Sequence, residues 1–138
     1  MQRLEHANVS VRDAASIIRF LGTAFPSFRV RGEGLDDLGR PWCHFGDDEM
    51  YVALTSLGAG ETRRPYGNTC GLNHLGFEVD DIDALRQRME GAGYQHNLRF
   101  DDHPARRRIY FHDAEGNDWE FVEYLTPDRA QRNDYLQR

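Results

Sequence analysis

The chain has 138 residues, of which 39% are hydrophobic and 29% charged, and its formal net charge is −6. This length suffices for one domain with its own core, and no apolar run approaches the length of a membrane span. An acidic chain also lacks the positive surface that nucleic acids attract. Because Cys43 and Cys70 are too few for a disulfide scaffold and no signal peptide is recognisable, we expect reduced thiols in a cytoplasmic protein.

The first predicted strand lies in a segment that recurs later in the chain. Residues 4–13 (LEHANVSVRD) and 72–81 (LNHLGFEVDD) share Leu, His, Val and Asp at matching places. Both alternate apolar and polar residues, as a half-buried strand does. In both, the last Asp is a suitable N-cap for a helix, predicted over 13–20 and 81–90. The repeat therefore predicts two equivalent modules.

Three further strands are predicted after each helix. The first set covers residues 28–31, 42–45 and 50–55, and the second set covers 95–100, 107–112 and 119–124. Residues 56–70, which contain Gly, Thr, Arg and Pro, are interpreted as a linker, and a helical tail is predicted over 126–138. The predicted fold class is therefore α+β, with two strand–helix–three-strand modules over residues 1–55 and 71–125.

Strand alternation predicts that each sheet has one apolar face and one polar face. The apolar sets should pack beneath the helices, and His6, His74 and Glu120 should project from the opposite surface. A single polar residue on such a face is ordinarily just solvated. Two histidines at repeat-equivalent positions with a carboxylate on the same face, however, favour the ligand set of a non-haem iron site or of some catalytic zinc sites.

These motifs resemble the vicinal oxygen chelate superfamily, which contains glyoxalases, bleomycin-resistance proteins and extradiol dioxygenases. The resemblance is carried by Leu4-Glu5-His6, by Leu72-Asn73-His74 and by residues 111–121 (FHDAEGNDWEF), which are similar to the family signature DPxGNxxE with Ala114 in place of Pro. It spans residues 4–124 and implies one glyoxalase-like domain over 1–125. In such a domain curved mixed sheets surround a shared cavity, with the helices on the outer face. It also implies that His6, His74 and Glu120 bind a metal.

The fourth ligand position of such sites aligns with Ala53, which cannot bind metal. This departure argues against a standard glyoxalase, and the three remaining ligands are more similar to those of extradiol dioxygenases or fosfomycin-inactivating thiol transferases. The resemblance implies a divalent ion (Fe, Zn, Ni or Mn) that chelates adjacent oxygens of a small-molecule substrate and stabilises an oxyanion. Lyase, isomerase, thiol-transfer and dioxygenase chemistry all stay open.

Five further residues on the same predicted face are candidates for substrate binding. Arg108 could pair with a carboxylate or phosphonate, and Tyr110 or His112 could act as a general acid or base. Each is also interpretable as an ordinary strand residue. The full set is Tyr51, Thr55, Arg108, Tyr110 and His112. The run 106–108 is interpreted as a solvated strand edge, and His44 is expected on the helix-packing face.

Two other function classes stay open. A metal-free protein of the bleomycin-resistance type would bind a drug or metabolite in an aromatic-lined cavity, and a regulatory protein could reuse the fold for a macromolecular partner. We also expect a homodimer, since open sheet edges favour pairing and relatives commonly pair or exchange modules. With exchange, His6 would come from one chain, and His74 and Glu120 from the other.

Overall fold

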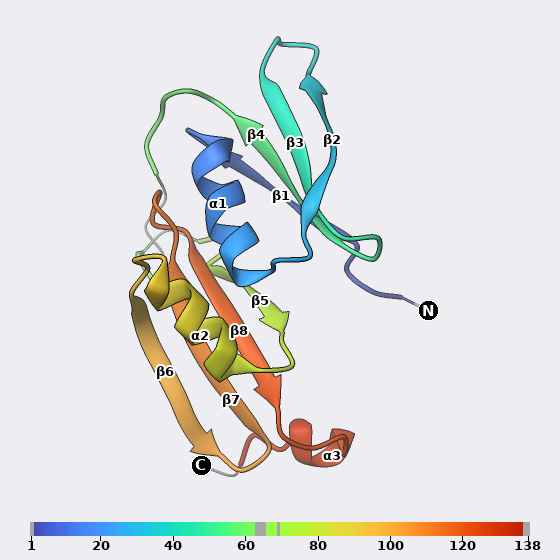
Figure 1. Cartoon of the computed structure of the whole chain (residues 1–138), viewed down its shortest axis with the longest axis vertical. Helices are drawn as coiled ribbons and strands as arrows, with labels where there is room; N and C mark the ends of the chain where they lie inside the picture. Colours follow the sequence, from blue (N-terminus) through green and yellow to red (C-terminus); the bar gives the residue numbers. More distant parts are fainter. Residues whose placement is uncertain (1, 63–65, 69, 137–138) are drawn as a thin grey trace. The chain divides into compact units, whose positions relative to one another are not determined.

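A computed structural model of the protein describes residues 2–62, 66–68 and 70–136 (Figure 1). Contacts along the chain divide it into two compact units, Met1–Thr62 and Arg63–Arg138, and each is described by itself. Within the described ranges, no helix has both the length and the apolar character that a membrane crossing requires.

Unit 1 consists of one strand, one helix and three further strands. These are β1 (His6–Val11), α1 (Ala14–Ala24), β2 (Arg29–Leu35), β3 (Pro41–Gly46) and β4 (Tyr51–Ser56). The sheet order is β1-β4-β3-β2, in which β1 and β4 are parallel and the other neighbours antiparallel. A parallel pair needs a long crossover connection, and the segment with α1, β2 and β3 supplies it.

The helix α1 begins where the sequence predicts. The Asp13 carboxylate accepts hydrogen bonds from the backbone amides of Ala15 and Ser16, which satisfies two amides that lack a partner within the helix. From there, helical spacing directs one apolar stripe toward β3 and β4. The core of unit 1 is formed by Ile17, Phe20 and Leu21 of the helix with Cys43, Phe45, Val52 and Leu54 of the strands.

Unit 2 repeats this topology and adds a short helix at its end. Its elements are β5 (His74–Glu78), α2 (Ile82–Gly91), β6 (His96–His103), β7 (Arg106–His112), β8 (Asp118–Tyr124) and α3 (Arg129–Arg132). The sheet order is β5-β8-β7-β6 with β5 and β8 parallel, and α2 packs on one face (Figure 1). The predicted fold class of two strand–helix–three-strand modules with mixed sheets is therefore confirmed.

The turn between β7 and β8 explains the signature-like stretch of the sequence. The carboxylate of Asp113, which is only 6% exposed, accepts hydrogen bonds from the amides of Glu115 and Asn117, at 2.9 and 3.0 Å. Its other oxygen accepts from the Asn117 side chain and from Nε1 of Trp119. Gly116 allows the turn to close, because its φ is +81°. This one carboxylate therefore joins the turn to the first residues of β8, which hold Glu120.

The arginine run corrects one expectation. Because β7 lies between β6 and β8, residues 106–108 are not at a sheet edge, and the interpretation as a solvated edge is wrong. Arg107 points to the helix side, where it pairs with Asp83 of α2 at 2.7 Å and with Glu123 of β8. A charged side chain is tolerated on the apolar side because two carboxylates neutralise it.

Candidate functional site

His74 and Glu120 lie on neighbouring parallel strands of unit 2, on the face away from α2. Nε2 of His74 is 3.1 Å from Oε2 of Glu120. Gly76 faces Glu120 across the strand pair, and a Cβ atom at position 76 would lie 3.4 Å from Oε2. A methyl group at position 76 would therefore touch this carboxylate oxygen at an ordinary van der Waals distance. Two of the three predicted metal ligands are together in one unit.

The second oxygen of Glu120 has its own donor. The Tyr110 hydroxyl donates a short hydrogen bond to Oε1, and the Tyr110 ring meets the His74 ring edge-on at 5.5 Å between centroids. Burial, followed by this hydrogen bond, raises the pKa of Tyr110 above its ordinary value. Tyr110 therefore stays protonated and holds Oε1, which leaves Oε2 as the oxygen that faces His74. Tyr110 was a sequence candidate and belongs to this site.

The hydrogen-bond pattern of His74 leaves a gap that a cation fits. Its Nδ1 is 2.8 Å from Oδ1 of Asn73, and an amide oxygen only accepts, so Nδ1 carries the hydrogen. In a neutral ring, Nε2 then has a lone pair directed at a carboxylate oxygen. Two acceptors at this separation repel each other unless a second ring proton or a metal ion lies between them.

The separation of these two atoms also suits a metal ion. With bonds of roughly 2.0–2.2 Å, two ligands at a right angle lie about 3.0 Å apart, and two tetrahedral ligands lie about 3.4 Å apart. The 3.1 Å between Nε2 of His74 and Oε2 of Glu120 falls in this range. Imidazole with carboxylate is moreover a donor pair that zinc, iron and manganese accept. The His74–Glu120 pair therefore supplies two donor atoms at a spacing that is compatible with a divalent ion.

A second polar cluster lies two residues earlier on β8, around Asp118, whose side chain is fully buried. Asp118 accepts a hydrogen bond from the Tyr66 hydroxyl at 2.6 Å and another from Asn97 at 3.2 Å. Nε2 of His112, a sequence candidate, lies 3.3 Å from the same carboxylate. Burial, followed by the bond to Asp118, raises the pKa of Tyr66 to about 12. Both oxygens of Asp118 thus have polar partners, and this carboxylate fixes the positions of Tyr66, Asn97 and His112.

Sequence reasoning missed most of this cluster. Asp118 shares the predicted polar face with Glu120, so alternation alone could have singled it out. Asn97 lies at a register shift between β6 and β7, where alternation gives no guide. Tyr66 falls within the predicted linker, which has no periodicity at all.

Arg108 supplies a positive charge near the same face. It follows the alternation of β7 onto the side of Tyr110, and its guanidinium lies 4.8 Å from the centroid of the Phe100 ring. Within the described part of the chain, Arg108 forms no ion pair with a carboxylate. This cation is therefore available to an anionic group of a ligand.

The corresponding face of unit 1 is aromatic. The Tyr51 ring stacks on His6 at 4.8 Å and on His44 at 4.5 Å between centroids, and the guanidinium of Arg31 lies over it. His44 was expected on the helix-packing face, and that expectation is wrong. The buried neighbours of His44 on β3, Cys43 and Phe45, take that face instead. Thr55 lies further along β4, on the same face as Tyr51.

Strand register shows how the two modules correspond. In unit 1, His6 pairs with Tyr51 and Asn8 with Ala53; in unit 2, His74 pairs with Asp118 and Gly76 with Glu120. Ala53 therefore occupies in its module the position that Glu120 occupies in the other. Alanine supplies no donor atom, so unit 1 offers only His6 from the predicted ligand set.

His6 is also held by its preceding residue, since its Nδ1 is 2.5 Å from Oε2 of Glu5. His6 belongs to unit 1, whereas His74 and Glu120 belong to unit 2, so the complete triad stays a prediction. Within either unit, the described residues hold no group of three or more His, Cys, Asp or Glu side chains that could bind a metal.

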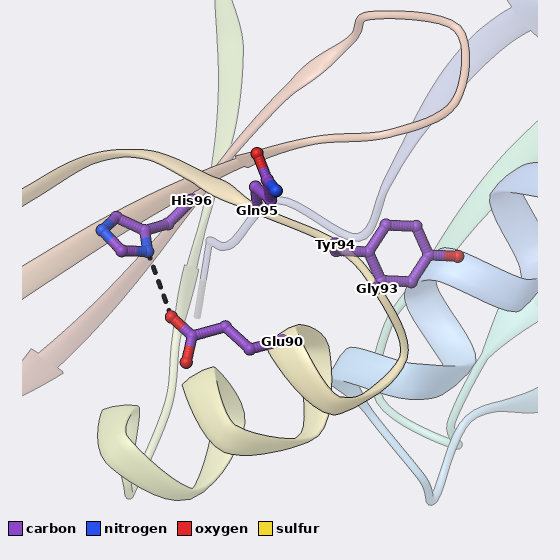
Figure 2. A pocket seen from close by; sticks show the side chains of 5 residues that line it. All are labelled: Glu90, Gly93, Tyr94, Gln95 and His96. Carbon is purple, nitrogen blue, oxygen red and sulfur yellow. Dashed lines mark hydrogen bonds and ion pairs between the residues drawn. The ribbon is translucent and has the colours of Figure 1, made fainter.

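A pocket lies elsewhere on unit 2, at the end of α2 and the start of β6. It is lined by Glu90, Gly93, Tyr94, Gln95 and His96 (Figure 2). The His96 ring contacts Phe111, which is buried on the helix side of the sheet. His96 therefore lies on the helix side of the sheet, and none of the predicted site residues lines the pocket.

A family model and a curated protein match the sequence of this chain. The family model of the Glyoxalase/Bleomycin resistance protein/Dioxygenase superfamily matches residues 3–121. The uncharacterized protein YaeR of Escherichia coli (strain K12) is 38% identical over 76 residues, which cover 54% of this chain and 59% of YaeR. The chain thus matches about three fifths of the length of this curated relative.

Solved structures share the fold at low sequence identity. A glyoxylase/bleomycin resistance protein/dioxygenase domain from Frankia sp. EAN1pec matches with a TM-score of 0.76 and 20% identity, over 93% of this chain and 96% of that one. A variant of the fosfomycin resistance protein FosX from Listeria monocytogenes, complexed with Mn(II) and 1S,2S-dihydroxypropylphosphonic acid, matches with a TM-score of 0.70 and 18% identity, over 97% and 99%. At these identities the likeness establishes the fold alone.

Proposed function

Because the chain belongs to the Glyoxalase/Bleomycin resistance protein/Dioxygenase superfamily, we propose that it is a small divalent-metal-dependent enzyme acting on an oxygen-rich small molecule. The observation that supports this most directly is the pair of acceptors, Nε2 of His74 and Oε2 of Glu120, that face each other at 3.1 Å. The other polar atom of each side chain is already engaged, by Asn73 and Tyr110 respectively. Either a second ring proton or a metal ion would relieve this contact, and the proposal assigns a metal ion to it.

The proposed ligands are His74 and Glu120 of unit 2 together with His6 of unit 1. When bound, the ion supplies Lewis acidity toward adjacent oxygens of the substrate. Since Ala53 contributes no donor, a three-ligand site keeps positions open for those oxygens. The Mn(II) in the FosX complex supports a divalent ion in this superfamily, with iron, zinc, nickel and manganese all compatible with the ligand set.

The residues around the ion would orient the substrate. Tyr110 keeps Glu120 in one orientation, and Arg108 offers a guanidinium to an anionic group such as a carboxylate or phosphonate. His112 is partly exposed beside the buried Asp118 and is the candidate to accept or donate a proton. Lyase, isomerase, thiol-transfer and dioxygenase reactions are all consistent with this set.

The test is the metal content of protein purified without chelators or a histidine tag. The wild type should hold close to one divalent ion per chain after exposure to Fe, Zn, Ni or Mn, and His74→Ala and Glu120→Ala should lose it. His96→Ala is a matched control, because His96 lies 3.2 Å from Glu90 on the opposite side of the same sheet. Wild-type protein that takes up none of the four ions would refute the proposal.

A second candidate function rests on the aromatic face of unit 1. Tyr51, His44 and Trp42 form adjoining ring contacts there, and such surfaces bind flat or cationic ligands by stacking. A metal-free drug- or metabolite-binding protein of the bleomycin-resistance type would use this face. It predicts ligand binding that a chelator does not change and no turnover of the ligand.

The proposal extends to the assembly of the protein. We expect one glyoxalase-like domain over residues 1–125, followed by a tail over 126–138, and we expect it to form a homodimer. β2 and β6 end their respective sheets, and such edges favour pairing. Light scattering at micromolar concentration tests the dimer, and a monomer there would contradict it.

A further inference from the structure

We propose that Glu5 and Asn73 are positioning residues, each of which fixes the tautomer and orientation of the histidine that follows it. This inference deepens the proposed function and rests on it. Oε2 of Glu5 lies 2.5 Å from Nδ1 of His6, and Oδ1 of Asn73 lies 2.8 Å from Nδ1 of His74. In both cases the oxygen meets Nδ1 rather than Nε2.

The same local arrangement occurs at equivalent places of the two modules. His6 and His74 are the first residues of β1 and β5, the parallel edge strands of their sheets. Glu5 and Asn73 lie just before these strands, so the strict alternation of side chains does not yet direct them to the opposite face. Different side chains, one charged and one neutral, thus make the same contact twice.

The chemistry explains why such a contact matters at a metal site. A neutral imidazole carries one hydrogen, on either nitrogen, and only the other nitrogen can bind a metal. An oxygen acceptor at Nδ1 holds the hydrogen there, so Nε2 presents its lone pair. Without the acceptor, both tautomers are populated and the ring rotates more freely. Partners of this kind typically change metal affinity by roughly 10- to 100-fold.

An ion pair alone would be a different explanation for the Glu5 contact. The side chains of His6 and Glu5 are 43% and 58% exposed, and exposed ion pairs contribute little. The two explanations separate in Glu5→Gln, which keeps an oxygen acceptor but removes the charge. If Glu5 orients His6, Glu5→Gln should keep most of the metal affinity that Glu5→Ala loses. If Glu5 acts only through its charge, Glu5→Gln should lose as much affinity as Glu5→Ala.

The experiment measures Zn(II) affinity of the full chain by competition with a chromogenic chelator. We expect Glu5→Ala and Asn73→Ala each to weaken binding about 10-fold, and the double variant about 100-fold. Glu5→Gln and Asn73→Asp should recover most of the loss. Glu49→Ala is the control for charge, since Glu49 pairs with Arg3 on the same unit. Thermal unfolding of the metal-free variants checks that each one folds.

A second readout is the tautomer itself. Long-range proton–nitrogen correlation spectra of the Zn(II)-loaded protein should show hydrogen on Nδ1 of both histidines and metal on Nε2. Metal on Nδ1, or wild-type affinity in both alanine variants, would overturn this inference while leaving the metal site in place. Failure of the wild type to bind Zn(II), Mn(II), Ni(II) or Fe(II) would overturn the proposed function itself.

Discussion

Replacing Asp113 by alanine should destabilise unit 2 far more than an ordinary turn substitution does. The Asp113 carboxylate accepts four hydrogen bonds, from two backbone amides, the Asn117 side chain and Nε1 of Trp119. Trp119 is only 1% exposed, so its indole N–H would lose its partner where water does not reach. An orphaned buried donor costs about 1–3 kcal/mol, and loss of the turn bonds adds about 1 kcal/mol. We therefore expect a loss of roughly 2–4 kcal/mol.

The equivalent turn of unit 1 provides the control. Asp47 precedes β4 as Asp113 precedes β8, and its carboxylate accepts from the amides of Glu49 and Met50 at 2.9 and 3.0 Å. No buried indole depends on it. Asp47→Ala should therefore cost only about 1 kcal/mol.

Urea unfolding followed by tryptophan fluorescence measures the difference. In a Trp42→Phe background, Trp119 is the only tryptophan and reports on unit 2. A separate pair of Trp119→Phe variants is followed by far-UV circular dichroism, because their remaining tryptophan lies in unit 1. In these variants the cost of Asp113→Ala should fall by about 1–2 kcal/mol, because no indole is then left unpaired. Equal losses for Asp113→Ala and Asp47→Ala, or no coupling to Trp119, would show that the indole bond does not anchor β8.

Three further predictions concern the polar face of unit 2. Tyr110→Phe removes the donor to Oε1 of Glu120 and should weaken metal binding about 10-fold, as measured by chelator competition, without loss of the fold. Saturating Zn(II), at about 100 times its dissociation constant, should stabilise the wild type by about 2.7 kcal/mol in urea unfolding and should leave His74→Ala unchanged. The pKa of Tyr66 is raised to about 12 in the folded protein. The stabilisation of the fold by the protonated Tyr66 hydroxyl is therefore complete below the ordinary tyrosine pKa near 10 and is lost between about pH 10 and 12. The alkaline loss of stability should therefore be smaller in Tyr66→Phe, and an identical pH profile in both proteins would contradict this.

The sequence predicted those features that local chemistry determines. Asp13 and Asp81 cap their helices as expected, since capping depends only on the next three residues. Alternation around Glu120 predicted its face, and the repeat predicted the correspondence of Ala53 with Glu120 that strand register confirms. The family inferred from these motifs is also confirmed.

The features that were missed depend on contacts distant in sequence. His44 was assigned to the wrong face because Trp42, His44 and Phe45 are all aromatic, so aromatic character alone does not reveal the phase of β3. Arg107 is on the apolar side only because Asp83 and Glu123, 24 and 16 residues away, neutralise it there. Neither partner can be recognised before the fold brings it close.

The two modules share a backbone plan, but their polar faces carry different side chains. The histidine that begins the parallel edge strand is kept in both, as is an oxygen acceptor before it. The positions next to it differ, however: Ala53 and His44 in unit 1 correspond by register to Glu120 and Tyr110 in unit 2. Unit 2 therefore has the His74–Glu120 pair on which the proposed ion site rests, whereas unit 1 has Ala53 and a surface of stacked rings at the corresponding positions. Under the proposed function, the ion would depend mainly on unit 2, and the aromatic surface of unit 1 supports the second candidate function. Trp42→Ala removes a ring of this surface that contacts His44, and it should accordingly change ligand binding with little effect on metal affinity. Tyr51 stacks on His6, so a substitution at Tyr51 should change both.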